Sequence, residues 1–148
     1  MKVAILMGSP RDDKKMAGAS EMLTRFGVEH EVHVMSAHRS PEEVAEFASN
    51  ARSNGFGVII CGAGMAAHLA GVVSAHTTIP VIGVPLSGGI SGGMDALLST
   101  VQMPRGIPVA TVAVDGSANA GVLAVEILSL SNGDLVAQLQ RFRDEGAR

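Results

Sequence analysis

The most telling part of the chain is Gly57-Val58-Ile59-Ile60-Cys61-Gly62-Ala63-Gly64-Met65-Ala66-Ala67-His68-Leu69, where an apolar run leads directly into a glycine-rich segment that carries a histidine. The apolar run is typical of a strand that is buried on both faces, as in a parallel sheet. Similar runs lie at about residues 3–7, 29–35, 81–84 and 109–114, and helical patterns separate them. This alternation predicts an α/β fold with a five-stranded parallel sheet.

The helical patterns carry recognisable start and stop signals. The first begins near Asp12 and stops at Gly27, while the second begins at Ser40-Pro41, with Glu43 placed as in a capping box. Further helices are expected at about residues 65–76, 94–102, 118–130 and 134–145. With right-handed crossovers, the expected architecture is a flavodoxin-like three-layer α/β/α sandwich with strand order 2-1-3-4-5 and a C-terminal helix.

Composition narrows the class of protein. The 148 residues are 47% hydrophobic, which fits a single domain spanning residues 1–148. A net charge of −3 without a Lys/Arg run argues against nucleic acid and membrane surfaces as partners. One cysteine excludes an internal disulfide, and the histidine spacing fits no metal site. The apolar start is too short for a signal peptide, so we expect a cytoplasmic protein.

Three polar segments follow the first three predicted strands. They begin at Gly8-Ser9, at Ser36-Ala37-His38-Arg39 and at Gly62. In the expected strand order the chain direction reverses between the first and third strands, so these segments meet at one carboxyl edge. We therefore expect one site for an anionic small molecule.

Each segment also has a purely structural interpretation. Gly-Ser after a strand is often only a tight turn, and Asp12 can act only as a helix cap. His38 and Arg39 could be an exposed pair on a surface loop, and His68 could be a core histidine. Functionally, Arg39 suits phosphate, and the imidazole of His38 can exchange protons near neutral pH.

The glycine-rich segment also matches the dinucleotide-binding pattern G-x-G-x-x-A at residues 62–67. That pattern requires an acidic residue about twenty positions later to hold a ribose. No Asp or Glu occurs between Phe47 and Met94, so the glycines more plausibly admit a smaller ligand.

Taken together, the motifs resemble the PurE family over nearly the whole chain. The similarity rests on Gly8-Ser9-x-x-Asp12, Ser36-Ala37-His38-Arg39, Gly62-Ala63-Gly64-Met65-Ala66-Ala67-His68-Leu69, Pro80-Val81-Ile82-Gly83-Val84-Pro85, Val101-Gln102-Met103-Pro104, Gly106-x-Pro108-Val109-Ala110-Thr111-Val112 and Asn119-Ala120. The resemblance implies a cofactor-free N5-carboxyaminoimidazole ribonucleotide mutase of purine biosynthesis. Its substrate is a phosphorylated ribonucleotide, and its assembly is a homo-octamer.

The same resemblance implies roles for particular residues. His38 would be the proton carrier, with His68 as the second catalytic residue. Ser9, Asp12 and Arg39 would bind substrate. The rest of the implied binding set is Gly8, Ser36, Gly62, Ala63, Gly64, Met65 and Leu69. Arg11, Ala70 in place of a proline, and a short tail after Asp134 depart from the usual family pattern.

Two other functions remain open from the sequence. The family's second branch carboxylates aminoimidazole ribonucleotide directly with carbon dioxide, and the His68-Leu69 pair favours the mutase over it. The other alternative is a non-catalytic nucleotide-binding module of the same shape, in which His38 would need no acid–base role.

Overall fold

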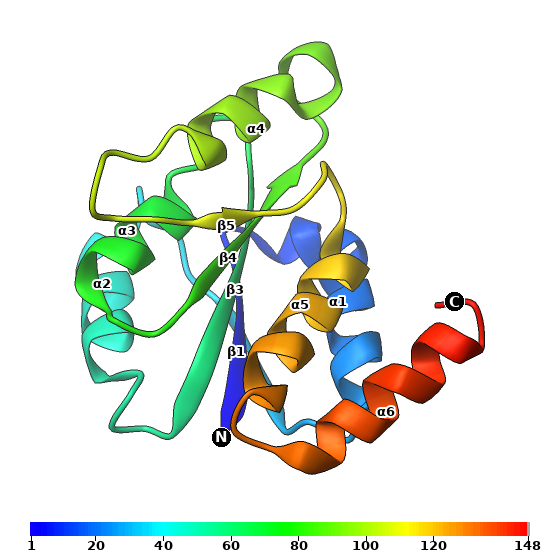
Figure 1. Ribbon diagram of the computed structural model, residues 1–148. Helices are drawn as coiled ribbons and strands as arrows, with labels where there is room; N and C mark the ends of the chain where they lie inside the picture. Colours follow the sequence, from blue (N-terminus) through cyan, green and yellow to red (C-terminus); the bar gives the residue numbers. More distant parts are fainter. Residues whose placement is uncertain (148) are drawn as a thin grey trace.

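The computed structural model describes residues 1–147 and is built around a parallel sheet (Figure 1). Within these residues the sheet has five strands in the order β2-β1-β3-β4-β5. Their bounds are β1 Lys2–Met7, β2 His30–Val34, β3 Phe56–Gly64, β4 Val81–Leu86 and β5 Ala110–Thr111. The predicted fold class and strand order are confirmed.

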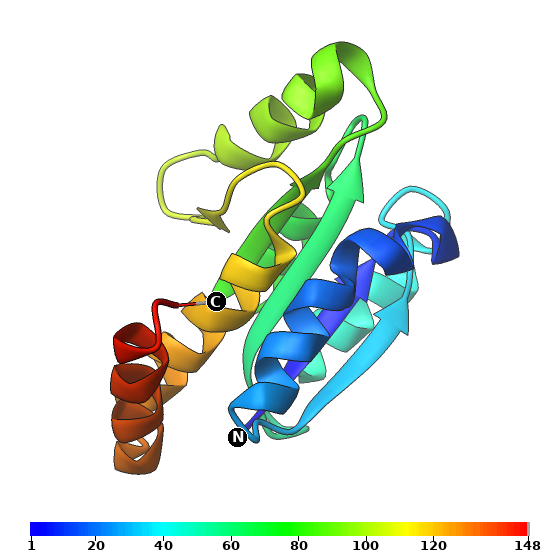
Figure 2. The ribbon, with the colours of Figure 1, turned by 90° about the vertical axis from the view of Figure 1, so that its right-hand side faces the viewer.

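Helices cover both faces of the sheet. One face carries α2 (Pro41–Asn50) and α3 (Leu69–His76), and the other carries α1 (Asp13–Arg25) and α5 (Ser117–Ser129), with α6 (Gly133–Asp144) packed outside α5 (Figure 1). Two short 3-10 helices precede longer ones: η1 (Pro10–Asp12) before α1 and η2 (Ile90–Gly93) before α4 (Met94–Val101). Figure 2 shows α4 at the end of the molecule where the central strands finish.

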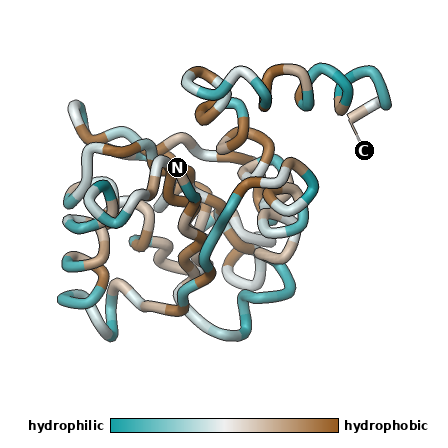
Figure 3. Tube along the Cα trace, turned by 90° about the horizontal axis from the view of Figure 1, so that it is seen from below, coloured by the Kyte–Doolittle hydropathy of each residue, from teal (hydrophilic) through white to brown (hydrophobic). Residues whose placement is uncertain are grey.

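The core is split in two by the sheet because successive strand residues point to opposite faces. Val3, Ile5 and Met7 of β1 pack under α1 and α5, whereas Ala4 and Leu6 pack under α2 and α3. Figure 3 shows the hydrophobic residues concentrated in the central strands, with α6 extending away from them. No helix within residues 1–147 has the length and apolarity needed to cross a membrane.

Two predicted boundaries are wrong. The helix expected from residue 65 begins only at Leu69, because β3 continues to Gly64, which pairs with Leu86 of β4. The last strand is two residues long: the Val112 N–H still bonds to the Gly83 carbonyl, but the chain then turns toward α5. The sheet edge therefore ends earlier than its apolar sequence suggests.

The start of α2 also differs from the capping-box prediction. The helix begins at Pro41 as expected, but the Ser40 side chain makes no cap hydrogen bond. Its hydroxyl lies 3.3 Å from both the backbone nitrogen and the carbonyl oxygen of Ser36. Ser40 thus closes the preceding turn instead of capping the helix.

The contact between α1 and α5 depends on a glycine. Gly121 is buried on α5, and a Cβ there would lie 2.9 Å from the Ala19 carbonyl oxygen and 2.8 Å from the Met22 Cβ. Both atoms belong to or adjoin the α1 backbone, which cannot move independently. Close approach of the two helices therefore requires a residue without a side chain.

We predict that Gly121→Ala lowers the free energy of unfolding by about 1–2 kcal/mol, because the overpacking penalty exceeds the gain in helix propensity. Chemical denaturation measures the difference. Gly133→Ala is the control, because no atom lies within 4 Å of its added Cβ. Equal stability of the two variants would contradict this account of the helix contact.

Candidate functional site

A cleft of about 540 Å³ opens where the central strands end. Its walls come from four chain segments, which follow β1, β2, β3 and β4. The lining residues are Gly8, Ser9, Arg11, Asp12, Ser36, Ala37, His38, Arg39, Ala63, Gly64, Met65, Ala66, His68, Leu69, Ser87, Gly88 and Gly89. The three segments expected to meet at one edge of the sheet therefore do so.

The segment after β1 is held by its own backbone. The Gly8 N–H donates to the Gly62 carbonyl at 3.3 Å, and the Asp12 N–H donates to the Ser9 carbonyl at 3.0 Å. The Ser9 Oγ accepts from the Arg11 N–H at 3.2 Å, which leaves its own O–H able to donate to a ligand.

Asp12 stands before α1, but its side chain makes no cap hydrogen bond. The carboxylate is thus not consumed by the helix and can accept hydrogen bonds in the cleft. Partial burial raises the pKa of Asp12, and the charge of Lys15 and a hydrogen bond from the Ser9 backbone only partly oppose that rise. The ionised carboxylate therefore costs the ligand-free protein some stability.

The segment after β2 is a closed turn. The Ser36 carbonyl accepts from the Arg39 N–H at 3.2 Å and from the Ser40 N–H at 2.8 Å. These bonds fix the backbone beneath His38 and Arg39, whose side chains are exposed at the cleft. A rigid turn therefore presents an imidazole and a guanidinium side by side.

The histidines of two segments meet across the cleft. His38 Nε2 lies 2.6 Å from His68 Nδ1, and the ring planes are 81° apart. In the neutral form each imidazole has one donor and one acceptor nitrogen, so one ring donates to the other. The two loops, predicted to meet at one edge of the sheet, are thus joined by a direct hydrogen bond.

His68 is not one turn into a helix, as its sequence position suggested. It occupies the residue just before α3, and its carbonyl accepts from the Val72 N–H at 2.9 Å. This position exposes the imidazole, so His68 is not a core histidine. Because β3 continues through Gly62, Ala63 and Gly64, beyond its predicted end, the imidazole of His68 lies at the cleft.

Met65 follows the last residue of β3 and has a φ of 56°, in the left-handed backbone region that residues other than glycine rarely adopt. Its side chain is 68% exposed and lines the cleft. A strained, exposed residue in a cleft wall is typical of functional sites.

Gly62 is the one residue of the predicted binding set that does not line the cleft. It is buried in β3, where a Cβ would lie 2.3 Å from Met16 Sδ. Its neighbour Cys61 is also buried, and burial raises the pKa of that thiol far above its usual range. Cys61 is therefore a packing residue and not a nucleophile.

The fourth wall was missed by sequence reasoning. Ser87, Gly88 and Gly89 follow β4 directly and line the cleft. The signal was present, because a small polar run after a buried strand is the same pattern that identified the other three segments.

Chemically, the cleft combines two arginines, two hydrogen-bonded histidines, one carboxylate and three serines. The arginines suit a phosphate, the carboxylate and hydroxyl suit sugar hydroxyls, and the imidazoles can move a proton. Among residues 1–147 no three His, Cys, Asp or Glu side chains are arranged to hold a metal ion.

Fold and cleft together define a flavodoxin-like α/β protein with a histidine pair at the switch point of its sheet. The chain belongs to the AIR carboxylase family, whose model matches residues 2–148.

Individual relatives agree with this membership. The N5-carboxyaminoimidazole ribonucleotide mutase of Vibrio vulnificus is 51% identical over 147 residues, which are 98% of this chain and 91% of the relative. The chloroplastic phosphoribosylaminoimidazole carboxylase of Vigna aconitifolia is 48% identical over 97% of this chain, but the match covers only 26% of that protein. The crystal structure of Treponema denticola PurE has a TM-score of 0.89, 28% identity, and coverage of 98% of this chain and 90% of its own.

We predict that Asp12→Asn raises the stability of the ligand-free protein at pH 7. Because the pKa of Asp12 is raised in the folded protein, ionisation of its carboxylate lowers the free energy of unfolding. This loss of stability is absent below a pH of about 3.9, the usual pKa of Asp in an unfolded chain, and fully present at a pH above the folded-state pKa. The gain should therefore shrink as the pH falls toward 4, as measured by urea midpoints. Asp13→Asn, at the exposed neighbouring residue, is the control. A gain in Asp12→Asn that is independent of pH would show that ionisation is not its cause.

Proposed function

We propose that this protein is an N5-carboxyaminoimidazole ribonucleotide mutase that acts in purine biosynthesis without a cofactor. It moves the carboxyl group of its substrate from the exocyclic nitrogen to C4 of the imidazole ring. The hydrogen bond between His38 and His68 in a cleft that also holds Arg39 carries this proposal. Relatives named for this activity match nearly the whole chain.

The chemistry needs one proton to be given and one to be taken back. His38 protonates the carbamate nitrogen, the carbon–nitrogen bond breaks, and carbon dioxide is released within the cleft. C4 of the ring then attacks carbon dioxide, and the C4 proton passes to His38, which restores the starting protonation state. A single imidazole can perform both transfers near neutral pH, and a closed site retains the carbon dioxide.

His68 orients this proton carrier. Because its Nδ1 is hydrogen-bonded to His38 Nε2, it fixes the ring of His38 and can share the proton being moved. The backbone of His68 is fixed at the start of α3, where its carbonyl accepts from the Val72 N–H. We therefore assign His38 as the proton carrier and His68 as its partner.

The remaining cleft residues bind the nucleotide. Arg39 pairs with the phosphate, Asp12 accepts from ribose hydroxyls, and the Ser9 hydroxyl donates to the ligand, while Gly8 lines the cleft without a side chain that would fill it. The carboxylate end lies against Ser36 and against Ala63, Gly64, Met65 and Leu69. Gly62 takes part indirectly, by accepting from the Gly8 N–H.

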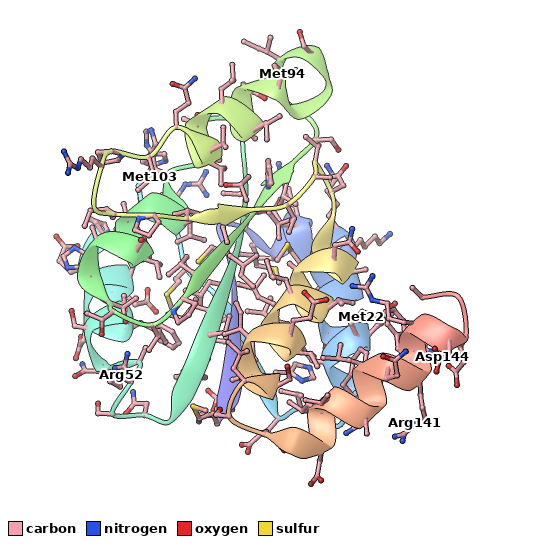
Figure 4. The ribbon with its side chains drawn as sticks, viewed as in Figure 1. Met22, Arg52, Met94, Met103, Arg141 and Asp144 are labelled. Carbon is pink, nitrogen blue, oxygen red and sulfur yellow. The ribbon has the colours of Figure 1, made fainter. Side chains whose placement is uncertain are left out.

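We further propose that residues 1–148 act as one catalytic domain of a cytoplasmic homo-octamer. An apolar row on η2 and α4 supports assembly: Ile90 is 74% exposed, and Met94, Leu98 and Val101 are each about half exposed. Figure 4 shows Met94 at the far end of the molecule from Arg141 and Asp144 of α6.

The second candidate is direct carboxylation of aminoimidazole ribonucleotide by carbon dioxide. It is favoured by the relatives named phosphoribosylaminoimidazole carboxylase, of which the Candida glabrata protein is 51% identical over 95% of this chain. Those matches cover about a quarter of the relatives, so the named activity belongs to much longer proteins. The His38–His68 hydrogen bond fits both reactions, whereas the His68-Leu69 sequence pattern favours the mutase, and a turnover assay decides between the two.

We predict rapid turnover of freshly made N5-carboxyaminoimidazole ribonucleotide at low bicarbonate, and none in His38→Asn, which should still bind the nucleotide. His76→Asn is the control, because His76 is exposed in the last turn of α3, away from the cleft lining. A coupled assay with the next pathway enzyme measures both.

Activity only with aminoimidazole ribonucleotide at high carbon dioxide would show that the protein is the carboxylase and not the mutase. If neither compound is turned over but the nucleotide still binds, the protein is a non-catalytic binding module. Near-normal turnover by His38→Asn would disprove its role as the proton carrier.

We predict that Arg39→Ala weakens nucleotide binding about 10- to 100-fold, because hydrogen bonds to a charged group contribute roughly 1.5–3 kcal/mol. Calorimetric titration with aminoimidazole ribonucleotide measures the change. Arg52→Ala is the control, because Arg52 contacts Thr78 and lies at the other end of the molecule (Figure 4). Equal affinities of the two variants would show that Arg39 does not bind the phosphate.

A further inference from the structure

Lys15 links α1 to the fourth wall of the cleft. Its Nζ donates to the Ser87 carbonyl oxygen at 2.5 Å and to the Ser87 Oγ at 2.8 Å, across 72 positions in the sequence. Lys15 does not line the cleft itself, and its side chain is half-buried. The contact is thus made behind the wall and not within the ligand space.

Ser87 is held from a second direction by Asp115. The Ser87 N–H donates to Asp115 Oδ1 at 2.9 Å, and the Asp115 N–H donates to the Pro85 carbonyl at 2.9 Å. Burial raises the pKa of Asp115, but the hydrogen bonds from Ser87 and the charge of Lys15 outweigh it and hold that pKa below its usual value. Asp115 is therefore ionised at neutral pH. We call Lys15, Ser87 and Asp115, which are joined by these hydrogen bonds, the clasp.

The segment that follows the clasp is built from permissive backbone. Gly88, Gly92 and Gly93 have φ values of 115°, 69° and 104°, and Ser91 has a φ of 50°. Asp95 fixes the far end of this segment, because its carboxylate accepts from the Ile90 N–H and the Ala96 N–H at 2.9 Å each. Gly88 and Gly89 lie between the clasp and this second anchor, and both line the cleft.

We propose that Lys15 is a positioning residue of the active site, which holds the Gly88–Gly89 wall in its ligand-binding position through Ser87. This role rests on the proposed function, since it concerns the same cleft. The wall needs to be held because it consists of two glycines, and glycine loses more conformational freedom on ordering than any other residue. If the clasp is broken, ligand binding must order the segment, and the free energy spent on this ordering lowers the affinity for the ligand.

Lys15 also faces the carboxylate of Asp12, whose pKa its charge lowers. Lys15→Met alone would remove that attraction together with the clasp. Ser87→Ala weakens the clasp and leaves the charge of Lys15 in place, because it removes the hydroxyl that Lys15 contacts but keeps the bond from Lys15 to the Ser87 carbonyl. A double variant then shows whether Lys15 acts through Ser87.

The test compares Lys15→Met, Ser87→Ala, the double variant, and Lys15→Arg as the conservative replacement, with Lys14→Met as the control. Lys14 is exposed on the same helix turn. Two quantities are measured: hydrogen exchange of residues 87–93 in the ligand-free protein, and KM and kcat for N5-carboxyaminoimidazole ribonucleotide.

In Lys15→Met we expect exchange about fivefold faster or more, a KM about tenfold higher, and kcat within about twofold of the unmodified chain. Ser87→Ala should show smaller changes in the same direction, and the double variant should match Lys15→Met. Lys15→Arg should recover most of the loss, and Lys14→Met should change nothing.

Unchanged exchange and KM in Lys15→Met would overturn the proposal, as would a double variant whose KM effect is the product of the two single effects. If Lys15→Met fails to fold, Lys15→Gln takes its place, and unchanged exchange and KM in that variant overturn the proposal, because Ser87→Ala retains the bond from Lys15 to the Ser87 carbonyl. Absence of turnover in the unmodified chain would instead count against the proposed function, while the exchange rates would still test the clasp.

Discussion

The structure depends on the parallel pairing of β1 with β2 on one side and with β3 on the other. The register places Met7 beside Val34 and also beside Gly62. Three chain segments must therefore leave the sheet next to one another, whatever their sequences. This arrangement creates the cleft, because the helices that follow diverge to opposite faces of the sheet (Figure 1). The chemistry of the site then depends on which side chains lie in the segments that follow these strands.

The chain is polar just beyond β1 and β3 because these central strands are largely buried and cannot accommodate groups such as Asp12 or His68. The edge strand β2 is only partly buried and itself carries His30, Glu31 and His33, so His38 and Arg39 owe their place to the turn that follows it. Backbone hydrogen bonds fix the turn at Ser36, and the β3 extension fixes the approach to His68. The two imidazoles thus meet at 2.6 Å without any buried charge. A conformationally strained residue, Met65, makes the turn between β3 and α3 possible.

The sheet and its strand order could be predicted from sequence because apolar runs and helix signals are local patterns. The three cleft segments followed from topology, since strand ends on one edge must meet. The His38–His68 hydrogen bond could not be predicted, because it depends on β3 pairing with β4 as far as Leu86, a contact between distant residues. The capping box at Ser40 failed for a similar reason: the hydroxyl bonds to Ser36, which local helix rules do not consider.

The four cleft walls differ in what holds them. The walls after β1, β2 and β3 are held mainly by backbone hydrogen bonds, which any residue except proline can donate. The wall after β4 is tied by the side chains of Lys15, Asp115 and Asp95. Side-chain ties can be altered by single substitutions without disturbing the sheet, whereas backbone ties cannot. Variation at these positions can therefore change how the cleft receives a ligand while His38 and His68 keep their geometry.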